Sequence, residues 1–195
     1  LARAGWKPRK LAVTRDGEEY GIGRAGEVVD YAVEMKRLPA EGMLDRLVDA
    51  DAVTHEMIGR LVARLADFHA QAEAGERVRR AGGYEALVGE WKENFEQARP
   101  YIGRTLSRAR FDRVRAYVDS YLGREKALLL RREAEGRVRD CHGDLRSDSV
   151  CFDPAAAGGI CIFDCIEFNE RFRCCDTGLD VAFLAMDLDF RGRRD

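Results

Sequence analysis

The sequence has 195 residues and a formal net charge of -2; 46% of the residues are hydrophobic and 35% are charged. This length and apolar content suit one domain, or two small lobes, with a real core, and the near-neutral charge gives no reason to expect nucleic-acid binding. The sequence contains neither a run of eighteen apolar residues nor an apolar stretch of the signal-peptide kind at its start, so we expect no membrane partner and a cytoplasmic location.

The first 35 residues predict three β-strands. Strands over 10–14 and 18–22 flank Asp16 and Gly17, a dipeptide typical of hairpin turns, and a strand rich in Val and Tyr follows over 28–35. We expect these strands to form the edge of a small antiparallel sheet.

Three glycines between the second and third strands, Gly21, Gly23 and Gly26, form a G-x-G-x-x-G pattern. A Rossmann fingerprint requires a helix directly after the glycines, and a β-type run follows here, so that interpretation fails. A protein-kinase glycine loop is the second interpretation. It requires a further helix and two more strands before the large lobe, and we therefore prefer a plain turn between two strands.

Apolar residues recur at helical spacing from residue 41 onward. The predicted helices cover 43–48, 54–69, 84–97, 107–133 and 177–190, whereas 71–83 reads as a polar loop. Their expected caps and terminal residues are Thr54, Ser107 or Thr105, Gly136, and the carboxylates Asp176 and Asp180 in the first turn of the last helix. We expect His69 to be a helix-end or core histidine.

Two aspartates frame a predicted β-hairpin with strands over 150–152 and 160–163. Asp144 lies on the loop before the first strand and Asp164 ends the second, so both are expected at one end of the hairpin. Phosphoryl transfer uses such a pair, because one carboxylate orients the attacking hydroxyl and the other holds the magnesium that bridges the nucleotide phosphates. The kinase form of the motif is H-x-D, an Asn five residues later and a separate Asp. His142 supplies the first residue and is expected to hold the loop by hydrogen bonding.

The candidate site residues have the following expected roles. Asp144 orients the acceptor hydroxyl, and Asp164 is the main magnesium ligand. Ser149 occupies the position of the kinase Asn and offers a neutral oxygen, with Asp148 beside it as a substitute ligand. Arg146 is either directed at the transferred phosphate or is a surface arginine paired with Asp148 or Asp140.

Six cysteines lie in the last third of the chain. Free thiols in apolar strands behave as small hydrophobic side chains, which is the interpretation we favour. Four of them offer the alternative of a zinc site, although their spacing is not that of paired C-x-x-C motifs. These are Cys161, Cys165, Cys174 and Cys175.

The motifs resemble those of the aminoglycoside phosphotransferase and choline kinase-like superfamily, in particular its uncharacterised bacterial branch, whose members are often fused to a P-loop kinase domain. The resemblance rests on Cys-His-Gly-Asp-Leu-Arg (141–146), Ile-Phe-Asp-Cys-Ile-Glu-Phe-Asn-Glu-Arg-Phe-Arg (162–173) and Asp-Val-Ala-Phe-Leu-Ala-Met-Asp-Leu (180–188), and weakly extends back to about Val28. It implies an α+β fold of the two-lobed protein kinase-like type. Residues 1–38 would be a remnant of the small β lobe with the hinge, and 39–195 the helical large lobe.

The resemblance also implies ATP and Mg²⁺ as cofactors and a small-molecule hydroxyl as acceptor. It makes the backbone of Met35, Lys36, Arg37 and Leu38 the connector that binds adenine. The phosphate-cradling loop and phosphate-anchoring lysine of the family would precede residue 1, so the chain is a shortened piece, a degenerate relative, or completed by a partner chain.

The implied function is transfer of the γ-phosphate of ATP to a small-molecule hydroxyl, with a fused or partner P-loop kinase domain as the expected neighbour. The alternative is a catalytically degenerate, pseudokinase-like or regulatory binding domain, suggested by Ser149 and by the missing lysine. A zinc-stabilised interaction module is a third option.

Overall fold

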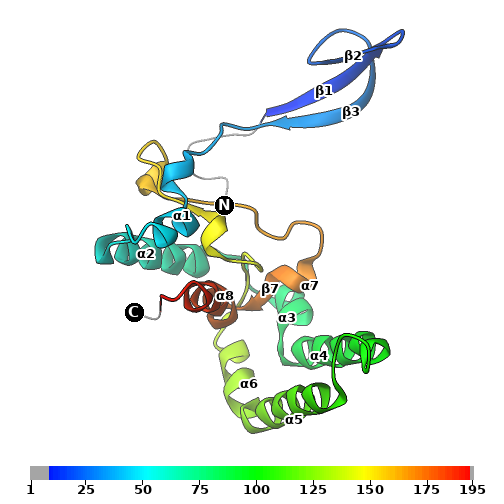
Figure 1. The fold of residues 1–195 in the computed structure, drawn as a ribbon, viewed down its shortest axis with the longest axis vertical. Coiled ribbons are helices and arrows are strands. Elements are labelled where there is room, and N and C mark those ends of the chain that lie inside the picture. Colours follow the sequence, from blue (N-terminus) through cyan, green and yellow to red (C-terminus); the bar gives the residue numbers. More distant parts are fainter. Residues whose placement is uncertain (1–8, 194–195) are drawn as a thin grey trace. The chain divides into compact units, whose positions relative to one another are not determined.

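The computed structural model describes residues 9–193, and they form an α+β structure (Figure 1). The elements in chain order are β1 (Arg9–Asp16), β2 (Glu19–Ile22), β3 (Glu27–Glu34), α1 (Leu44–Asp49), α2 (His55–Gln71), α3 (Glu76–Gly82), α4 (Tyr84–Ala98), α5 (Arg108–Arg124), α6 (Lys126–Ala134), β4 (Val138–Asp140), β5 (Val150–Cys151), β6 (Cys161–Ile162), α7 (Glu170–Arg173), β7 (Cys174–Asp176) and α8 (Thr177–Phe190).

Contacts between residues divide the chain into two compact units. The first contains the residues up to 54 together with 147–163, and the second contains 55–146 together with the residues from 164 onward. The predicted division between residues 38 and 39 follows the family resemblance and stays a prediction.

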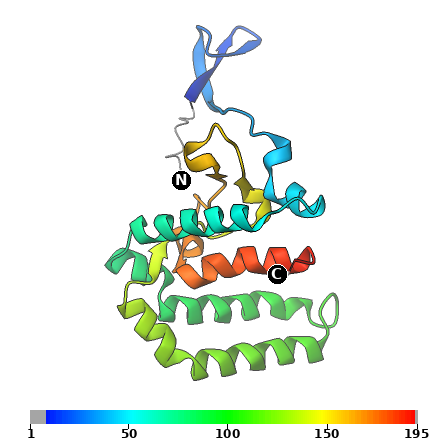
Figure 2. The same cartoon turned by 90° about the vertical axis from the view of Figure 1, so that its left-hand side faces the viewer.

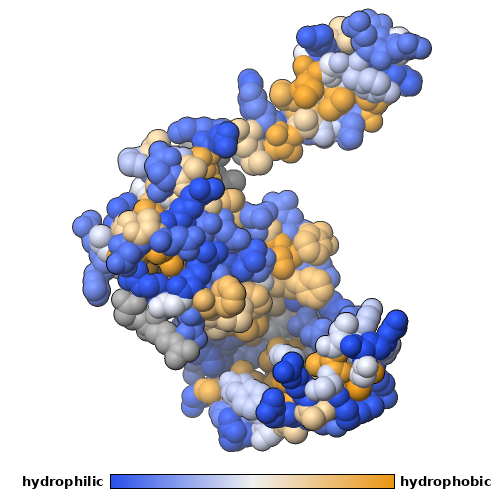
Figure 3. Space-filling model, in the orientation of Figure 1, coloured by the Kyte–Doolittle hydropathy of each residue, from blue (hydrophilic) through white to orange (hydrophobic). Residues whose placement is uncertain are grey.

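An antiparallel sheet with strand order β2-β1-β3 begins the first unit. The hairpin prediction is confirmed, since Asp16 pairs with Glu19 across a turn at Gly17. The three glycines lie in β2 and in the bend before β3, so the plain-turn interpretation is also confirmed. Apolar side chains are exposed on this sheet (Figure 3), among them Val33 and Tyr31.

The second part of the first unit packs α1 on the β5–β6 hairpin. Leu44 of α1 and Val150 of β5 are fully buried, and the backbone of Cys151 forms an isolated antiparallel β-bridge with Met43. The two predicted strands are confirmed as an antiparallel pair but are shorter than expected, because only Val150–Cys151 and Cys161–Ile162 are paired.

The second unit is mainly helical, and Figure 2 shows α2, α8, α4 and α5 one below the other with roughly parallel axes. Aromatic and aliphatic side chains of α4 and α5 form its larger core cluster, namely Phe95, Phe111, Val118 and Leu122. A smaller cluster joins α3 to the two-stranded β4–β7 ladder through Val78, Ala81, Val138 and Cys174. No helix among residues 9–193 is both long enough and apolar enough to cross a bilayer.

Two helix predictions for this unit are wrong. Residues 71–83 contain α3, because Val78 and Ala81 bury their side chains against the β4–β7 ladder and so stabilise a helix only seven residues long. The single helix predicted over 107–133 is divided into α5 and α6 at Glu125, whose φ of -92° and ψ of 3° leave the helical region. The predicted cap Ser107 is confirmed, since its side chain accepts a hydrogen bond from the Arg110 N–H.

The segment after residue 164 contains more structure than the irregular chain we expected, because α7 and β7 precede the last helix. Residue pairs Val138–Asp176 and Asp140–Cys174 align β4 with β7, and these partners are 38 and 34 positions apart in the sequence. The predicted last helix is confirmed as α8, and Asp176 caps it by accepting a hydrogen bond from Gly178 N–H at 2.7 Å.

Candidate active site

The loop that carries Asp144 leaves the end of β4. Its first residues continue the β4–β7 ladder, because the Cys141 N–H donates to the Arg173 carbonyl at 3.1 Å. The His142 carbonyl then accepts a hydrogen bond from the Ile166 N–H at 3.0 Å. These backbone contacts fix the direction in which the chain enters the loop.

Gly143 allows the turn that brings Asp144 out of the ladder. Its φ is +86°, and a Cβ atom there would lie 2.6 Å from the Phe172 carbonyl oxygen. A side chain is therefore excluded both by the backbone conformation and by the neighbouring helix α7. The sequence Cys-His-Gly-Asp thus has glycine where the fold has no space for another residue.

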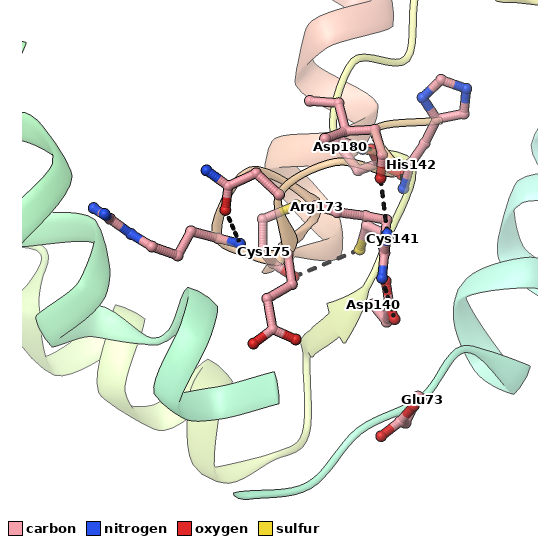
Figure 4. A network of polar contacts seen from close by, with 12 residues as sticks. Glu73, Asp140, Cys141, His142, Arg173, Cys175 and Asp180 are labelled. Carbon is pink, nitrogen blue, oxygen red and sulfur yellow. Dashed lines mark hydrogen bonds and ion pairs between the residues drawn. The ribbon is translucent and has the colours of Figure 1, made fainter. Parts of the chain in front are cut away.

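Asp180 of α8 lies beside His142 and contacts this loop (Figure 4). Its carboxylate accepts hydrogen bonds from the Gly143 N–H at 2.9 Å and from the His142 N–H at 3.3 Å. The side chain is 1% exposed, and burial of a carboxylate requires such donors. The expected role of Asp180 as a helix-end carboxylate is therefore too narrow, because it connects α8 to the loop before Asp144.

His69 is the third donor to Asp180. Its Nε2 lies 2.8 Å from Asp180 Oδ2, and the ring is buried at the end of α2. Burial lowers the pKa of His69, but hydrogen bonds to Asp180 and Cys141 outweigh it and raise the pKa to about 9. The ring is therefore a cation at neutral pH, and the core-histidine prediction is confirmed with a charged partner.

Cys141 completes this cluster from the end of β4. Its thiol donates to the Cys175 carbonyl at 3.5 Å. Hydrogen bonding with Cys175 and with His69 outweighs burial and lowers the pKa of Cys141 to about 7. A buried group of three ionisable side chains, His69, Cys141 and Asp180, thus lies directly behind the loop.

Asp144 lies on the accessible side of the loop, with 43% of its side chain exposed. Its N–H donates to His142 Nδ1 at 3.4 Å, so His142 holds the loop as expected. Arg146 Nε lies 3.4 Å from the Asp144 carboxylate. Asp140, one of the surface partners expected for Arg146, is bound instead by Arg173.

A cavity of about 860 Å³ opens beside Asp144 within the helical unit. Residues of α4, α5, α6 and α8 line it, and Gly143 and Asp144 form part of its wall. The size is in the range of small-molecule sites. A carboxylate that is held in place and faces such a cavity can accept a hydrogen bond from a bound hydroxyl group.

Asp164 is exposed and has a left-handed backbone, with φ at 63°. Asp51 and Asp164 are the two non-glycine residues with positive φ among residues 9–193. Strain of this kind is tolerated by Asp and is frequent at functional sites. The expected strand over 160–163 is too long, because β6 covers only Cys161–Ile162, so Asp164 lies two residues beyond the end of the strand.

The other expected magnesium ligands lie in the first unit. Asp148 and Ser149 belong to the 3-10 helix Ser147–Ser149, and Ser149 is buried with 4% exposure. The Phe163 N–H donates to the Ser149 carbonyl at 3.1 Å. Carboxylate and hydroxyl oxygens are ligands that suit Mg²⁺, so the donor types of Asp164, Asp148 and Ser149 fit that ion.

Residues 35–38, the expected adenine connector, form an irregular link after β3. Met35 is 68% exposed, Arg37 is exposed, and Leu38 is partly buried. Lys36 Nζ lies 3.7 Å from the Asp153 carboxylate. The link thus leaves its backbone outside helices and strands, as a connector requires.

The zinc alternative finds no support in the part of the chain that the structure describes. All six cysteines are free, and the one group of three or more potential metal-binding side chains found there is His69, Cys141 and Asp180. The cysteines at 151 and 174 are buried as small apolar side chains, and burial raises the pKa of both to about 11.

Comparison with known proteins gives the family. The phosphotransferase enzyme family matches residues 1–194. This chain belongs to that family. Uncharacterized proteins of Mycobacterium bovis and Mycobacterium tuberculosis are 31% identical to it over 171 residues, which is 88% of this chain and 34% of each relative. The chain therefore spans about a third of the length of the curated relatives it matches, and no solved structure matches it.

Sequence reasoning did not find the Asp180–His69 pair of this phosphotransferase-family chain. The signal was present but ambiguous. His69 continues the buried positions Leu61 and Leu65 at a spacing of four, and Asp180 interrupts the apolar face that also contains Leu184. A titratable residue on the buried face of each helix indicates a partner, but the pattern does not show that the two meet.

Proposed function

We propose that the chain is part of an ATP-dependent phosphotransferase that transfers the γ-phosphate to the hydroxyl group of a small molecule. Membership of the phosphotransferase family supports the reaction class. The observation that carries the proposal is the position of Asp144, on a loop fixed by Asp180 and in the wall of an 860 Å³ cavity. We also infer the two-lobed protein kinase-like arrangement, on the basis of the family and of the loop.

Asp144 binds and orients the acceptor hydroxyl in this proposal. Phosphoryl transfer passes through a loose transition state, so the reaction needs positioning more than a strong base. Arg146, 3.4 Å from Asp144, supplies a fixed positive charge that stabilises negative charge on the transferred group. His142, Asp180 and His69 act through the loop, and they are positioning residues.

Asp164 would be the main ligand of Mg²⁺, with Ser149 and Asp148 as further oxygen donors. When bound, the ion neutralises charge on the nucleotide phosphates. The backbone of residues 35–38 would hydrogen-bond adenine. The proximity of Asp144 to Asp164 stays a prediction, as does the P-loop kinase domain that we propose for the remaining length of the longer relatives.

Replacement of Asp144 by Asn tests the proposal in the full-length protein. We expect turnover to fall by a factor of about 10² to 10⁴, since a positioned acid or base contributes that much. The melting temperature should not change, because the Asp144 side chain and its ion-pair partner Arg146 are both substantially exposed. Asp67→Asn on the exposed face of α2 is the matched control. Equal turnover in the two variants would contradict the role of Asp144.

A second candidate is a degenerate binding domain, and the serine at position 149 is the observation that favours it. Serine offers a weaker metal ligand than the amide of the kinase motif. A thermal-shift measurement separates the candidates, since a ligand that binds the folded state raises the melting temperature according to its concentration relative to Kd. A shift with ATP and Mg²⁺ followed by phosphoryl transfer supports the enzyme; a shift without transfer to any acceptor supports the binding domain.

A further inference from the structure

The cavity beside Asp144 limits the chemistry of the molecule that fits it, and the inference below rests on the proposed function. Most of its wall is apolar. The aromatic and aliphatic residues that define its shape are Leu87, Trp91, Tyr117, Tyr121, Leu128 and Phe183. Tyr117 and Tyr121 stack on each other with ring centroids 6.2 Å apart. Such a wall favours a flat apolar body, because stacking and apolar burial are what it offers a ligand.

Most charged side chains of the wall already have partners. Arg132 binds Asp176 through two hydrogen bonds of 2.8 Å. Asp180 faces the loop amides and His69. These charged groups are paired within the protein and leave little unpaired charge for a ligand.

Glu90 of α4 is the exception. Its Oε1 atom is shielded from solvent and accepts no hydrogen bond from the described part of the chain. Its ion-pair partner Arg171 lies 3.9 Å away and donates instead to Glu93 at 3.0 Å. Burial raises the pKa of the Glu90 carboxyl, which a bound cation would offset. A carboxylate in this condition is stabilised by an incoming N–H donor.

We propose that the acceptor is an amphipathic alcohol with a flat apolar body and a single amino group, which binds Glu90 while its hydroxyl group faces Asp144. An anionic acceptor is disfavoured, because the carboxylates of Glu90 and Asp144 line the cavity. A polycationic sugar is disfavoured as well, because its several ammonium groups require more free carboxylates than this wall provides, and its hydroxyl groups would face apolar side chains.

Four compounds that share the indole ring and differ in their amino, hydroxyl and carboxylate groups test this proposal. Tryptophanol has the amine and the hydroxyl, tryptophol has only the hydroxyl, tryptamine has only the amine, and indole-3-lactate has a hydroxyl and a carboxylate. Calorimetry with the full-length protein measures binding, and release of ADP measures transfer. We expect the two amines to bind at least about tenfold more tightly than the lactate, as one charge-assisted contact provides.

The matched variants are Glu90→Gln and Glu93→Gln, one turn apart on α4 and both partners of Arg171. Glu90→Gln should weaken tryptamine binding about tenfold and leave tryptophol binding unchanged, whereas Glu93→Gln should change neither. Equal loss in both variants would assign the effect to Arg171 and overturn the proposal. Tighter binding of kanamycin than of either indole amine would also overturn it.

Tryptamine cannot accept a phosphoryl group, so its binding separates this inference from the proposed function. Binding of tryptamine that depends on Glu90, with no transfer to any alcohol, supports the cavity inference and contradicts the phosphotransferase. Transfer to other alcohols without binding of either indole amine supports the phosphotransferase and overturns the cavity inference.

Discussion

His69 should make the stability of the helical unit depend on pH between 6.5 and 9. The pKa of His69 is raised from 6.5 to about 9 in the folded chain, where Asp180 stabilises the imidazolium. A raised pKa contributes stability that is fully present below pH 6.5 and is lost as the pH rises through 9. His69→Gln keeps an N–H donor for Asp180 and removes the charge, so the variant should lack this pH dependence.

The size of the effect follows from the shift. Each pKa unit corresponds to about 1.4 kcal/mol, so a shift from 6.5 to about 9 corresponds to about 3 kcal/mol. Below pH 6.5 the free energy of unfolding of the variant should be lower than that of the original chain by about this amount. Above pH 9 the two values should converge.

Urea unfolding at half-unit steps from pH 6 to pH 9.5 measures the difference. His55→Gln, at the exposed first residue of the same helix, is the control and should show no such convergence. Cys141 also contacts this histidine and has a lowered pKa, which acts in the opposite direction because thiolate stability is lost as the pH falls. The same comparison in a Cys141→Ala background removes that contribution. Parallel curves for His69→Gln and the original chain in both backgrounds would refute the reasoning.

Three further predictions concern the loop, the ladder and the metal ligand. Gly143→Ala should lower the free energy of unfolding by about 3 kcal/mol, because a Cβ would overlap a carbonyl of α7. Gly103 has nearly the same φ but open space around its Cα, so Gly103→Ala should lower it by only about 1 kcal/mol. Gly82→Ala should destabilise the fold by about 3 kcal/mol, since a Cβ would lie 2.0 Å from a carbonyl oxygen of β7. Gly89→Ala on α4 should stabilise the fold by about 1 kcal/mol, because Gly89 has open space for a Cβ and alanine favours the helix. Urea midpoints of the four variants check both pairs. Asp164→Asn keeps a residue that tolerates positive φ, so it should leave the melting temperature unchanged and abolish the thermal shift given by ATP with Mg²⁺.

Helices with a long apolar stripe and a clear cap were predictable from the sequence. The last helix was predicted over 177–190 and lies there, because Asp176 caps it and most of its residues are apolar. The helix α3 was missed, since four of its seven residues are arginine or glutamate, only two are buried, and two glycines lie at its end. Its stability comes from contact with β4 and β7, which local sequence does not report.

The sequence suggested the residues that we propose to react, but it did not suggest the residues that support them. Asp144 and Asp164 stand out because their spacing matches a known chemical arrangement. The strands β4 and β7 have only three residues each and pair across the sequence between 140 and 174, so no periodic pattern marks them. His69, the partner of Asp180, is 111 residues away in the sequence, and a capping role explained the presence of an aspartate at position 180 equally well.

The buried pair of His69 and Asp180 is better explained by loop geometry than by stability. Removal of two charges from water costs several kcal/mol for each, and apolar residues of the same volume often stabilise a core as well or better. An apolar pair, however, has no acceptor for the N–H groups of His142 and Gly143, which are donated to Asp180 at 3.3 and 2.9 Å. Those amides set the turn from which Asp144 faces the cavity. We therefore infer that the hydrogen bond from His69 on α2 keeps the Asp180 carboxylate on α8 aimed at the loop, so that the position of Asp144 depends on two helices that do not themselves contribute a reacting group.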